Sequence, residues 1–323
     1  MNRIVRSFAA AAALALAGGA FAQDTWPSKP ITLIVGFAAG GATDASARII
    51  AKKLADNVKQ SVVVDNRPGA GGNLAAQLVA NAPPDGYTIH LSSVGPLSVA
   101  PSLVKNLPYD PEKDLAPLTM GVVFPNVFVV HAAVPAKTFG EFIALAKKDP
   151  GSLNYASTGI GSASHLAGEL LKQRAGIDIV HIPYKGGGPI MTDLLAGRVT
   201  GYFSTLSTAG PHIEAGKLRA LATSGLTRMT ALPNVPTVAE SGFPGFEAVN
   251  WYALVAPGKT PPALLDRINA ELVKVLKDPD VQRQLGEHGM EPAPMTRAEL
   301  AAYIKKERDS WAKVIKTANI KAD

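Results

Sequence analysis

The stretch that decides the fold of this chain is IVGFAAGGATD, residues 34–44. Its first residues complete the strand-like run ITLIVGF, a glycine-rich turn follows, and Thr43 and Asp44 open an amphipathic helix. Backbone N–H groups and the positive end of the helix dipole converge where a strand, a glycine turn and a helix meet in this way. The stretch therefore predicts an α/β unit with an anion site at the helix start.

A second stretch repeats this pattern: YASTGIGSASH, residues 155–165. Two such helix starts facing each other across a cleft would hold a carboxylate between them without an arginine, because each hydrogen bond to a charged group contributes about 1.5–3 kcal/mol. Phosphate binding is less well supported, since neither loop has the G-x-x-x-x-G-K-[ST] or G-x-G-x-x-G spacing. For either loop alone, the alternative is that the glycines serve only a tight turn.

Strand-like and helix-like segments alternate along the rest of the chain, which favours a mainly parallel sheet with helices on both faces. The pattern restarts at NVFVVHAAVP, after residue 125, and a further strand, FEAVNWYALVAPG, follows near residue 246. We therefore expect two α/β domains, the first formed by residues 23–124 plus 248–323 and the second, inserted, by residues 125–247. If the chain crosses near residues 123–128 and 246–251, the crossings form a hinge on which a cleft closes.

The first 22 residues have the features of a secretory signal peptide. Arg3 and Arg6 precede a short apolar run, and small residues up to Ala22 provide a cleavage pattern, so we expect cleavage after Ala22 and export to the periplasm. The chain has no cysteine, which excludes a disulfide and a lipid-anchored cysteine. Removal of the two arginines lowers the net charge from +6 to +4, and the remaining basic residues are scattered, which argues against nucleic-acid binding.

Catalytic motifs are scarce. The sequence contains no H-E-x-x-H motif and no G-x-S-x-G elbow, and we expect no metal or cofactor. Among the six histidines, His165 is a candidate ligand contact because it lies in the first turn of the helix after the second glycine loop. Lys185, in PYKGGGP, offers a cation beside a flexible backbone, although a solvated surface lysine is an equally good interpretation.

Several longer segments together resemble the Bug or TctC-type substrate-binding proteins of tripartite tricarboxylate transport systems. They are WPSKPITLIVGFAAGGATD (26–44), VVDNRPGAGGNLAA (63–76), NYASTGIGSASHLAGELL (154–171), HIPYKGGGP (181–189) and LPNVPTVAESGFPGFE (232–247). The resemblance implies a periplasmic-binding-protein fold, in which two α/β domains with a hinge and a central ligand cleft close on a small organic acid. It also implies delivery of that acid to membrane permease subunits.

The resemblance also implies a set of ligand-binding residues. Phe37 would pack against the ligand, and the first loop would donate hydrogen bonds, with Asp44 matching the acid of the family. The other residues implied are Gly40, Gly41, Ala42 and Thr43 in the first loop, Ser157, Thr158, Gly159, Gly161 and Ser162 in the second, and Ser93, Tyr184, Lys185 and Gly186 at the sides. Asp44 would repel a bound anion, so we expect it to point away or to act through water.

Two positions depart from the family pattern. Many relatives have proline where Ala39 stands, and relatives commonly have an acid where this chain has Ser204. Because Ser204 offers no charge to a ligand ammonium, an amino-acid ligand is disfavoured, and a mono-, di- or tricarboxylic acid, including an aromatic one, is expected. We expect the protein to be a monomer. Two alternatives to transport stay open: a ligand-sensing receptor for a membrane two-component sensor, and a secreted hydrolase or isomerase.

Overall fold

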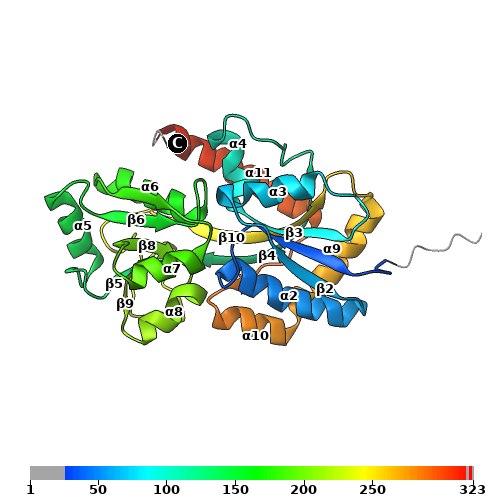
Figure 1. The fold of residues 1–323 in the computed structure, drawn as a ribbon, viewed down its shortest axis with the longest axis horizontal. Helices are drawn as coiled ribbons and strands as arrows, with labels where there is room; N and C mark the ends of the chain where they lie inside the picture. Colours follow the sequence, from blue (N-terminus) through cyan, green and yellow to red (C-terminus); the bar gives the residue numbers. More distant parts are fainter. Residues whose placement is uncertain (1–25, 318–319, 322–323) are drawn as a thin grey trace, which may run out of the picture.

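The computed structural model describes residues 26–317 and 320–321, and the predicted signal peptide lies outside them. The chain forms two β-sheets, each with helices on both faces. Figure 1 shows two lobes that lie side by side, a green one and one built from blue, cyan and orange segments, with the yellow strand running between them. The prediction of two α/β domains with a central cleft is confirmed.

The first sheet has the strand order β11-β4-β10-β3-β1-β2. Its strands are β1 (Ile31–Val35), β2 (Val62–Asn66), β3 (Thr88–Ser93), β4 (Leu115–Pro125), β10 (Val249–Pro257) and β11 (Glu291–Pro292). In β1, Leu33 and Val35 face one hydrophobic core and Ile34 faces another. This near-continuous apolar pattern is typical of a strand that is buried on both faces.

Helices on the two faces of the first sheet build these two cores. One face is covered by α2 (Ala42–Val58), α9 (Pro262–Lys277) and α10 (Pro279–Glu287). The other is covered by α3 (Asn73–Ala80), α4 (Ala100–Leu103) and α11 (Arg297–Thr317), with short turns of helix at Ala70–Gly72 and Gly95–Val99. No helix in the described ranges is long and apolar enough to cross a membrane.

The second sheet has the order β7-β6-β8-β5-β9. Its strands are β5 (Val127–His131), β6 (Asn154–Ser157), β7 (Val180–Pro183), β8 (Gly201–Ser204) and β9 (Leu218–Thr223). One core lies under α5 (Phe139–Lys148) and α6 (Ala163–Ala175), and the other under α7 (Gly187–Leu195) and α8 (Leu206–Glu214). Phe128 sits at the centre of the first of these cores, with three phenylalanine rings 4.8–5.6 Å from its own.

The chain passes from the first sheet to the second at Asn126, between β4 and β5, and returns before β10. Ser224 ties the crossings together. Its hydroxyl accepts a hydrogen bond from the Asn126 N–H and donates one to the Ala248 carbonyl, each 2.8 Å long. The crossings thus lie in the two predicted segments, while the domain bounds 23–124 plus 248–323 and 125–247 stay a prediction.

The expectation of mainly parallel sheets is wrong. The parallel pairs are β1 with β2 and β3, and β6 with β7 and β8. The antiparallel pairs are β10 with β3 and β4, β11 with β4, and β5 with β8 and β9. The reason is the insertion itself, because β4 carries the chain out of the first sheet and β10 carries it back in the opposite direction.

Candidate functional site

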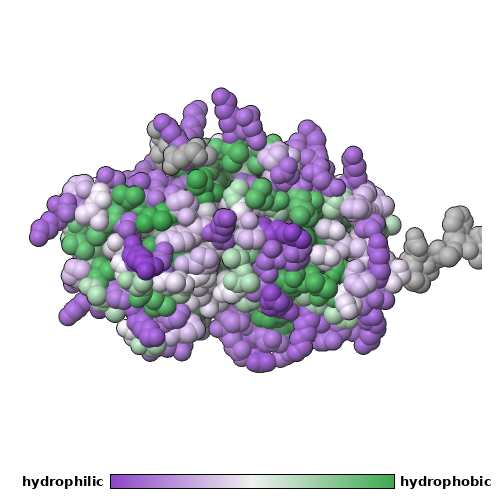
Figure 2. All heavy atoms as spheres, in the orientation of Figure 1, coloured by the Kyte–Doolittle hydropathy of each residue, from purple (hydrophilic) through white to green (hydrophobic). Residues whose placement is uncertain are grey.

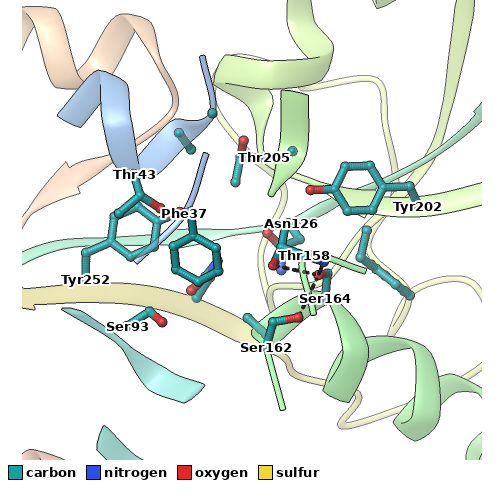
Figure 3. Close-up of a pocket in the computed structure, with 16 residues that line it drawn as sticks. Phe37, Thr43, Ser93, Asn126, Thr158, Ser162, Ser164, Tyr202, Thr205 and Tyr252 are labelled. Atoms are coloured by element: carbon teal, nitrogen blue, oxygen red, sulfur yellow. Dashed lines mark hydrogen bonds between the residues drawn. The ribbon is translucent and has the colours of Figure 1, made fainter. Parts of the chain in front are cut away.

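A small cavity lies between the two sheets, and residues of both domains line it (Figure 3). Its volume is about 30 Å³. Because one water needs roughly 10–15 Å³ in this measure, the cavity has room for two or three waters or for one carboxylate group. The lining residues are Phe37, Gly41, Ala42, Thr43, Ser93, Asn126, Thr158, Ser162, Ala163, Ser164, Gly187, Tyr202, Phe203, Thr205, Asn250 and Tyr252.

The first side of the cavity is the turn between β1 and α2. Gly41 occupies the N-cap position of α2, and no side chain of the described residues caps this helix, so its first N–H groups are left for another acceptor. In Figure 3, Phe37 and Tyr252 lie together on this side with Thr43 beside them. This helix start therefore keeps the anion-binding capacity that its sequence predicts.

Asp44, next to this turn, does not line the cavity. Its carboxylate accepts a hydrogen bond of 3.1 Å from the Gly40 N–H and forms an ion pair of 3.0 Å with Arg48. Burial favours the neutral acid, but hydrogen bonds from Arg48 and from the Gly40 N–H outweigh this effect and lower the pKa of Asp44. The acid is therefore ionised. Its charge pairs with Arg48, and its hydrogen bond from the Gly40 N–H stabilises the turn.

The second side of the cavity is the loop between β6 and α6. Ser162 caps α6 by accepting a hydrogen bond from the His165 N–H at 3.4 Å, and its hydroxyl lies 3.2 Å from that of Ser164. Ser164 in turn accepts from the Thr158 N–H at 3.0 Å. Figure 3 shows Thr158, Ser162 and Ser164 as one group joined by these bonds. Three hydroxyl groups thus meet at one helix start.

Two more helix starts reach the cavity from the second domain. Gly186 is the N-cap of α7 and Thr205 that of α8, and in neither case does a side chain of the described chain cap the helix. Gly187 and Thr205 line the cavity. Together with α2, three uncapped helices therefore direct their N-terminal turns at one small space, which adds to the positive potential there.

Polar groups line part of the cavity, but none of the described ones is charged. Within the described part of the chain, no lysine, arginine, histidine, aspartate or glutamate lines it. Burial raises the pKa of both Tyr202 and Tyr252 above that of a free tyrosine. Both phenols are therefore protonated at neutral pH and can donate hydrogen bonds.

Close backbone contacts join the two domains around the cavity. The Ala38 N–H donates to the Lys185 carbonyl at 3.1 Å. A methyl group placed on Gly71, which has φ +64°, would lie 2.3 Å from the carbonyl oxygen of Ile160 in the other domain. Only a residue without a side chain allows this approach, so the structure has its cleft closed.

Seven of the residues predicted from the sequence line the cavity. They are Phe37, Gly41, Ala42, Thr43, Ser93, Thr158 and Ser162. Ten others do not: Gly40, Asp44, Ser157, Gly159, Gly161, His165, Tyr184, Lys185, Gly186 and Ser204. These ten lie in the same loops or beside them, and the contacts of their side chains and backbone explain why most of them stay behind the lining.

His165 and Ser157 form part of a buried layer under the second loop. His165 accepts a hydrogen bond from the Gly161 N–H at 3.1 Å and stacks on His181, with ring centroids 4.2 Å apart. The hydroxyl of Ser157 lies 2.6 Å from Nε2 of His181. Burial, followed by electrostatic interactions with His165 and Lys172, lowers the pKa of His181 to about 3, so its ring is neutral.

Tyr184, Lys185 and Ser204 have other contacts. The Tyr184 hydroxyl donates to Asp193 at 2.7 Å. The side chain of Lys185 is exposed, and only its carbonyl takes part in the contact between domains. Ser204 donates to the Thr205 carbonyl at 3.1 Å. The interpretation of Lys185 as a solvated lysine thus fits its position.

Nine lining residues escaped the sequence analysis. They are Asn126, Ala163, Ser164, Gly187, Tyr202, Phe203, Thr205, Asn250 and Tyr252. Ser164 and Gly187 stand beside predicted residues, whereas Tyr202 and Tyr252 look like ordinary core residues of strands. A usable signal existed for Asn126 and Asn250, because each interrupts an apolar run in a segment predicted to cross between domains.

A larger hollow, of about 660 Å³, lies on the surface near Trp26, Lys29, Tyr87 and Arg267. Lys29 pairs with Asp85 at 3.0 Å, so its charge is already compensated. This groove is open and is formed by the first domain alone. Among the described residues, no group of three or more potential ligands is arranged to hold a metal ion.

Sequence comparison adds independent findings. Residues 46–320 match the model of the family described as "Tripartite tricarboxylate transporter family receptor". The chain is 40% identical over 293 residues, 90% of this chain and 87% of its relative, to a "UPF0065 protein in tcbD-tcbE intergenic region" of Pseudomonas sp. (strain P51). It is 38% identical over 299 residues, 92% of each chain, to "Protein BugT" of Bordetella pertussis.

Solved structures agree with this result. The fold matches that of "periplasmic binding protein BugD" with a TM-score of 0.89 and 35% identity, over 92% of this chain and 100% of the other. It also matches Rhodopseudomonas palustris Rpa4515 "with adipate", with a TM-score of 0.88 and 36% identity, over 92% of this chain and 99% of the other. A third match is MatC of Rhodopseudomonas palustris "with bound malate", with a TM-score of 0.86 and 32% identity, over 90% of this chain and 100% of the other. Two of these structures thus hold a small carboxylate.

Proposed function

The chain belongs to the tripartite tricarboxylate transporter receptor family, and on this premise we propose that it is a periplasmic receptor that captures a small organic acid. The acid binds in the cavity between the domains, the cleft closes on it, and the closed monomer delivers it to membrane permease subunits. The match to the receptor family, with its transporter name, supports the permease as partner.

The observation that carries this proposal is a small cavity formed by both domains and lined in part by neutral hydrogen-bond donors. Three uncapped helix starts, the phenols of Tyr202 and Tyr252 and a group of serine and threonine hydroxyls surround it. Micromolar affinity needs about 8 kcal/mol, and hydrogen bonds to a carboxylate contribute about 1.5–3 kcal/mol each. A few such bonds, formed only when both domains are in place, are therefore enough to make closure depend on the ligand.

The volume of the cavity limits what the closed site holds. About 30 Å³ accommodates one carboxylate group, so the rest of a di- or tricarboxylic acid requires side chains of the lining to make room while the Gly71 loop and the second loop stay in contact. Relatives with adipate and with malate support this ligand class. We propose that the carboxylate binds between Gly41 to Thr43 on one side and Thr158 and Ser162 on the other.

A catalytic role is less well supported. The pair formed by Ser157 and His181 has the spacing of a nucleophile and its base, with 2.6 Å between Ser157 Oγ and His181 Nε2. However, Ser157 is fully buried and does not line the cavity. An imidazole whose pKa is lowered to about 3 is also a poor general base at neutral pH. We therefore propose binding without turnover.

A thermal-shift screen of residues 23–323 tests the proposal with succinate, adipate, citrate and benzoate, and with aspartate, glucose and phosphate as other classes. A ligand at one hundred times its Kd adds about 2.7 kcal/mol to the free energy of unfolding. At about 2–4 °C per kcal/mol, the expected rise in Tm is about 5–11 °C. The proposal predicts such a rise with at least one carboxylate and no chemical change in the recovered acid. A rise with glucose or phosphate alone contradicts it.

A further inference from the structure

Two asparagines at the crossings between the domains each have one buried polar atom without a partner among the described residues. Asn126 follows β4, with 1% of its surface exposed, and its Nδ2 is unpaired. Asn250 lies at the start of β10, with 8% exposed, and its Oδ1 is unpaired. Both line the cavity. A buried polar group without a hydrogen bond is destabilising, so these two atoms are expected to bind something.

The two asparagines come from neighbouring segments of the first sheet and its crossing. Asn250 is paired with Phe124, two residues before Asn126 in the chain. Both side chains line the same cavity, whose volume is about 30 Å³. One small molecule can therefore contact both amides at once.

Two hydrogen bonds hold the backbone of Asn126 in place. Its N–H donates to Ser224 Oγ and its carbonyl accepts from the Ser224 N–H, each at 2.8 Å. In Figure 3, Asn126 lies at the centre of the cavity, beside Thr158 and Ser164. Its free N–H group is thus positioned to donate to a carboxylate that the second loop also contacts.

Among the described residues, Asn250 has an unpaired acceptor where Asn126 has an unpaired donor. Its Oδ1 is an acceptor, and a carboxylate oxygen placed against it would be repelled, so the ligand has to bring a donor to this point. An ammonium group would lack an opposing charge, because no acid lines the described cavity. A hydroxyl group satisfies Oδ1 without adding a second charge.

We propose that the site selects acids with a hydroxyl group close to the carboxylate, which donates to Asn250 Oδ1 while Asn126 Nδ2 donates to the carboxylate. This inference rests on the proposed function, since it assigns the ligand within the same cavity. It goes beyond that function by assigning the two crossing asparagines separate parts in ligand selection.

Calorimetric titration of the wild-type protein with acids that differ by one hydroxyl tests it. The pairs are malate against succinate and lactate against propionate. We expect the hydroxy acid of the better-bound pair to bind about tenfold more tightly, the effect of satisfying one buried acceptor. If neither succinate nor malate nor any other acid binds, the proposed function fails. If acids bind equally with and without the hydroxyl, only this inference is overturned.

The variant Asn250→Leu removes the acceptor at similar size and should bring the two members of the pair to within about twofold of each other. Asn250→Ala removes the same oxygen and serves as the test variant if Asn250→Leu does not fold. The matched control is Thr223→Val, which removes another unpaired buried oxygen, Thr223 Oγ1, that does not line the cavity. It should keep the tenfold preference. A preference that survives in both Asn250 variants overturns the assignment.

Discussion

Ser162 combines two roles, because it caps α6 and also lines the cavity. Ser162→Ala should lower the free energy of unfolding by about 1 kcal/mol through loss of the cap and weaken acid binding about tenfold through loss of a donor to the carboxylate. Urea unfolding and calorimetry measure the two effects separately.

Thr138 provides the matched control for this substitution. It caps α5 in the same way, accepting from the Glu141 N–H at 3.2 Å, but lies outside the cavity lining. Thr138→Ala should cost a similar free energy of unfolding and leave acid affinity unchanged. If Ser162→Ala binds acids as tightly as Thr138→Ala does, then Ser162 is only a cap.

His90 makes stability depend on pH. Its Nδ1 donates to the Ile34 carbonyl at 3.0 Å, and burial lowers its pKa from 6.5 to about 4. Between pH 6.5 and 4 the unfolded chain therefore binds a proton that the folded chain does not, so stability falls as pH falls through this window. Above pH 6.5 the residue has no effect, because it is neutral in both states.

His90→Asn keeps a donor for the Ile34 carbonyl and removes the titrating ring. Stability curves should show a slope between pH 6 and about 4.5 that is shallower by up to about 1.4 kcal/mol per pH unit than in the wild type. The slope between pH 7 and about 8 should not change. Equal slopes in both proteins below pH 6 would mean that His90 is charged in the folded state.

At the scale of single residues, site residues are hard to predict from the sequence when the same residue type would fit equally well in the hydrophobic core. Phe37 and Thr43 were named because the resemblance to the family implies them, and the glycine loop marks where they lie. Tyr202 and Tyr252 occupy strand positions where an apolar aromatic would fit equally well, so nothing in the sequence marks them. His165 has the right place in the chain, yet its ring stacks on His181 behind the lining.

At the scale of elements, closure depends on loops that approach backbone to backbone. Gly71→Ala should prevent full closure, because its methyl group would meet the Ile160 carbonyl 2.3 Å away. We expect acid affinity to fall at least about tenfold, measured by calorimetry, and the protein to keep its fold because the open form leaves room for the methyl group.

Gly216→Ala separates closure from backbone strain. Gly216 has φ +68°, close to the +64° of Gly71, but no described atom lies within 4 Å of the position that a methyl group would take. Both variants should lose about 1–2 kcal/mol of stability from the left-handed backbone, and only Gly71→Ala should lose affinity. Equal affinities would show that the Gly71 contact is not needed for binding.

Element types were largely readable from the sequence, whereas strand direction was not. The stripe of Ile268, Leu272 and Leu276 predicted α9 correctly, since a helix that packs on a sheet needs an apolar face. The antiparallel β10 follows from where the chain re-enters the first sheet, which local periodicity does not encode. For this reason the parallel prediction failed at the strands that cross between the domains.

At the scale of the whole molecule, the two domains are joined by a hydrophobic core as well as by the two chain crossings. Ala163 and Leu166 of α6, with Ile160 before this helix, pack into a core that is mainly built by the first domain, so the closed form buries apolar surface as well as the ligand site. Figure 2 shows hydrophilic side chains around the outline of this face, with hydrophobic patches between them. The sequence predicted two domains and a cleft, but which surfaces meet on closure depends on tertiary packing.

The most direct test of this account is a crystal structure of the protein with the carboxylate that binds best in the thermal-shift screen. We predict that the carboxylate lies in the cavity between the domains, within hydrogen-bond distance of the first turn of α2, of Ser162 and of Asn126 Nδ2, and that it contacts no charged side chain. An acid bound instead in the surface groove beside Lys29 and Arg267, with the central cavity filled only by water, would contradict it.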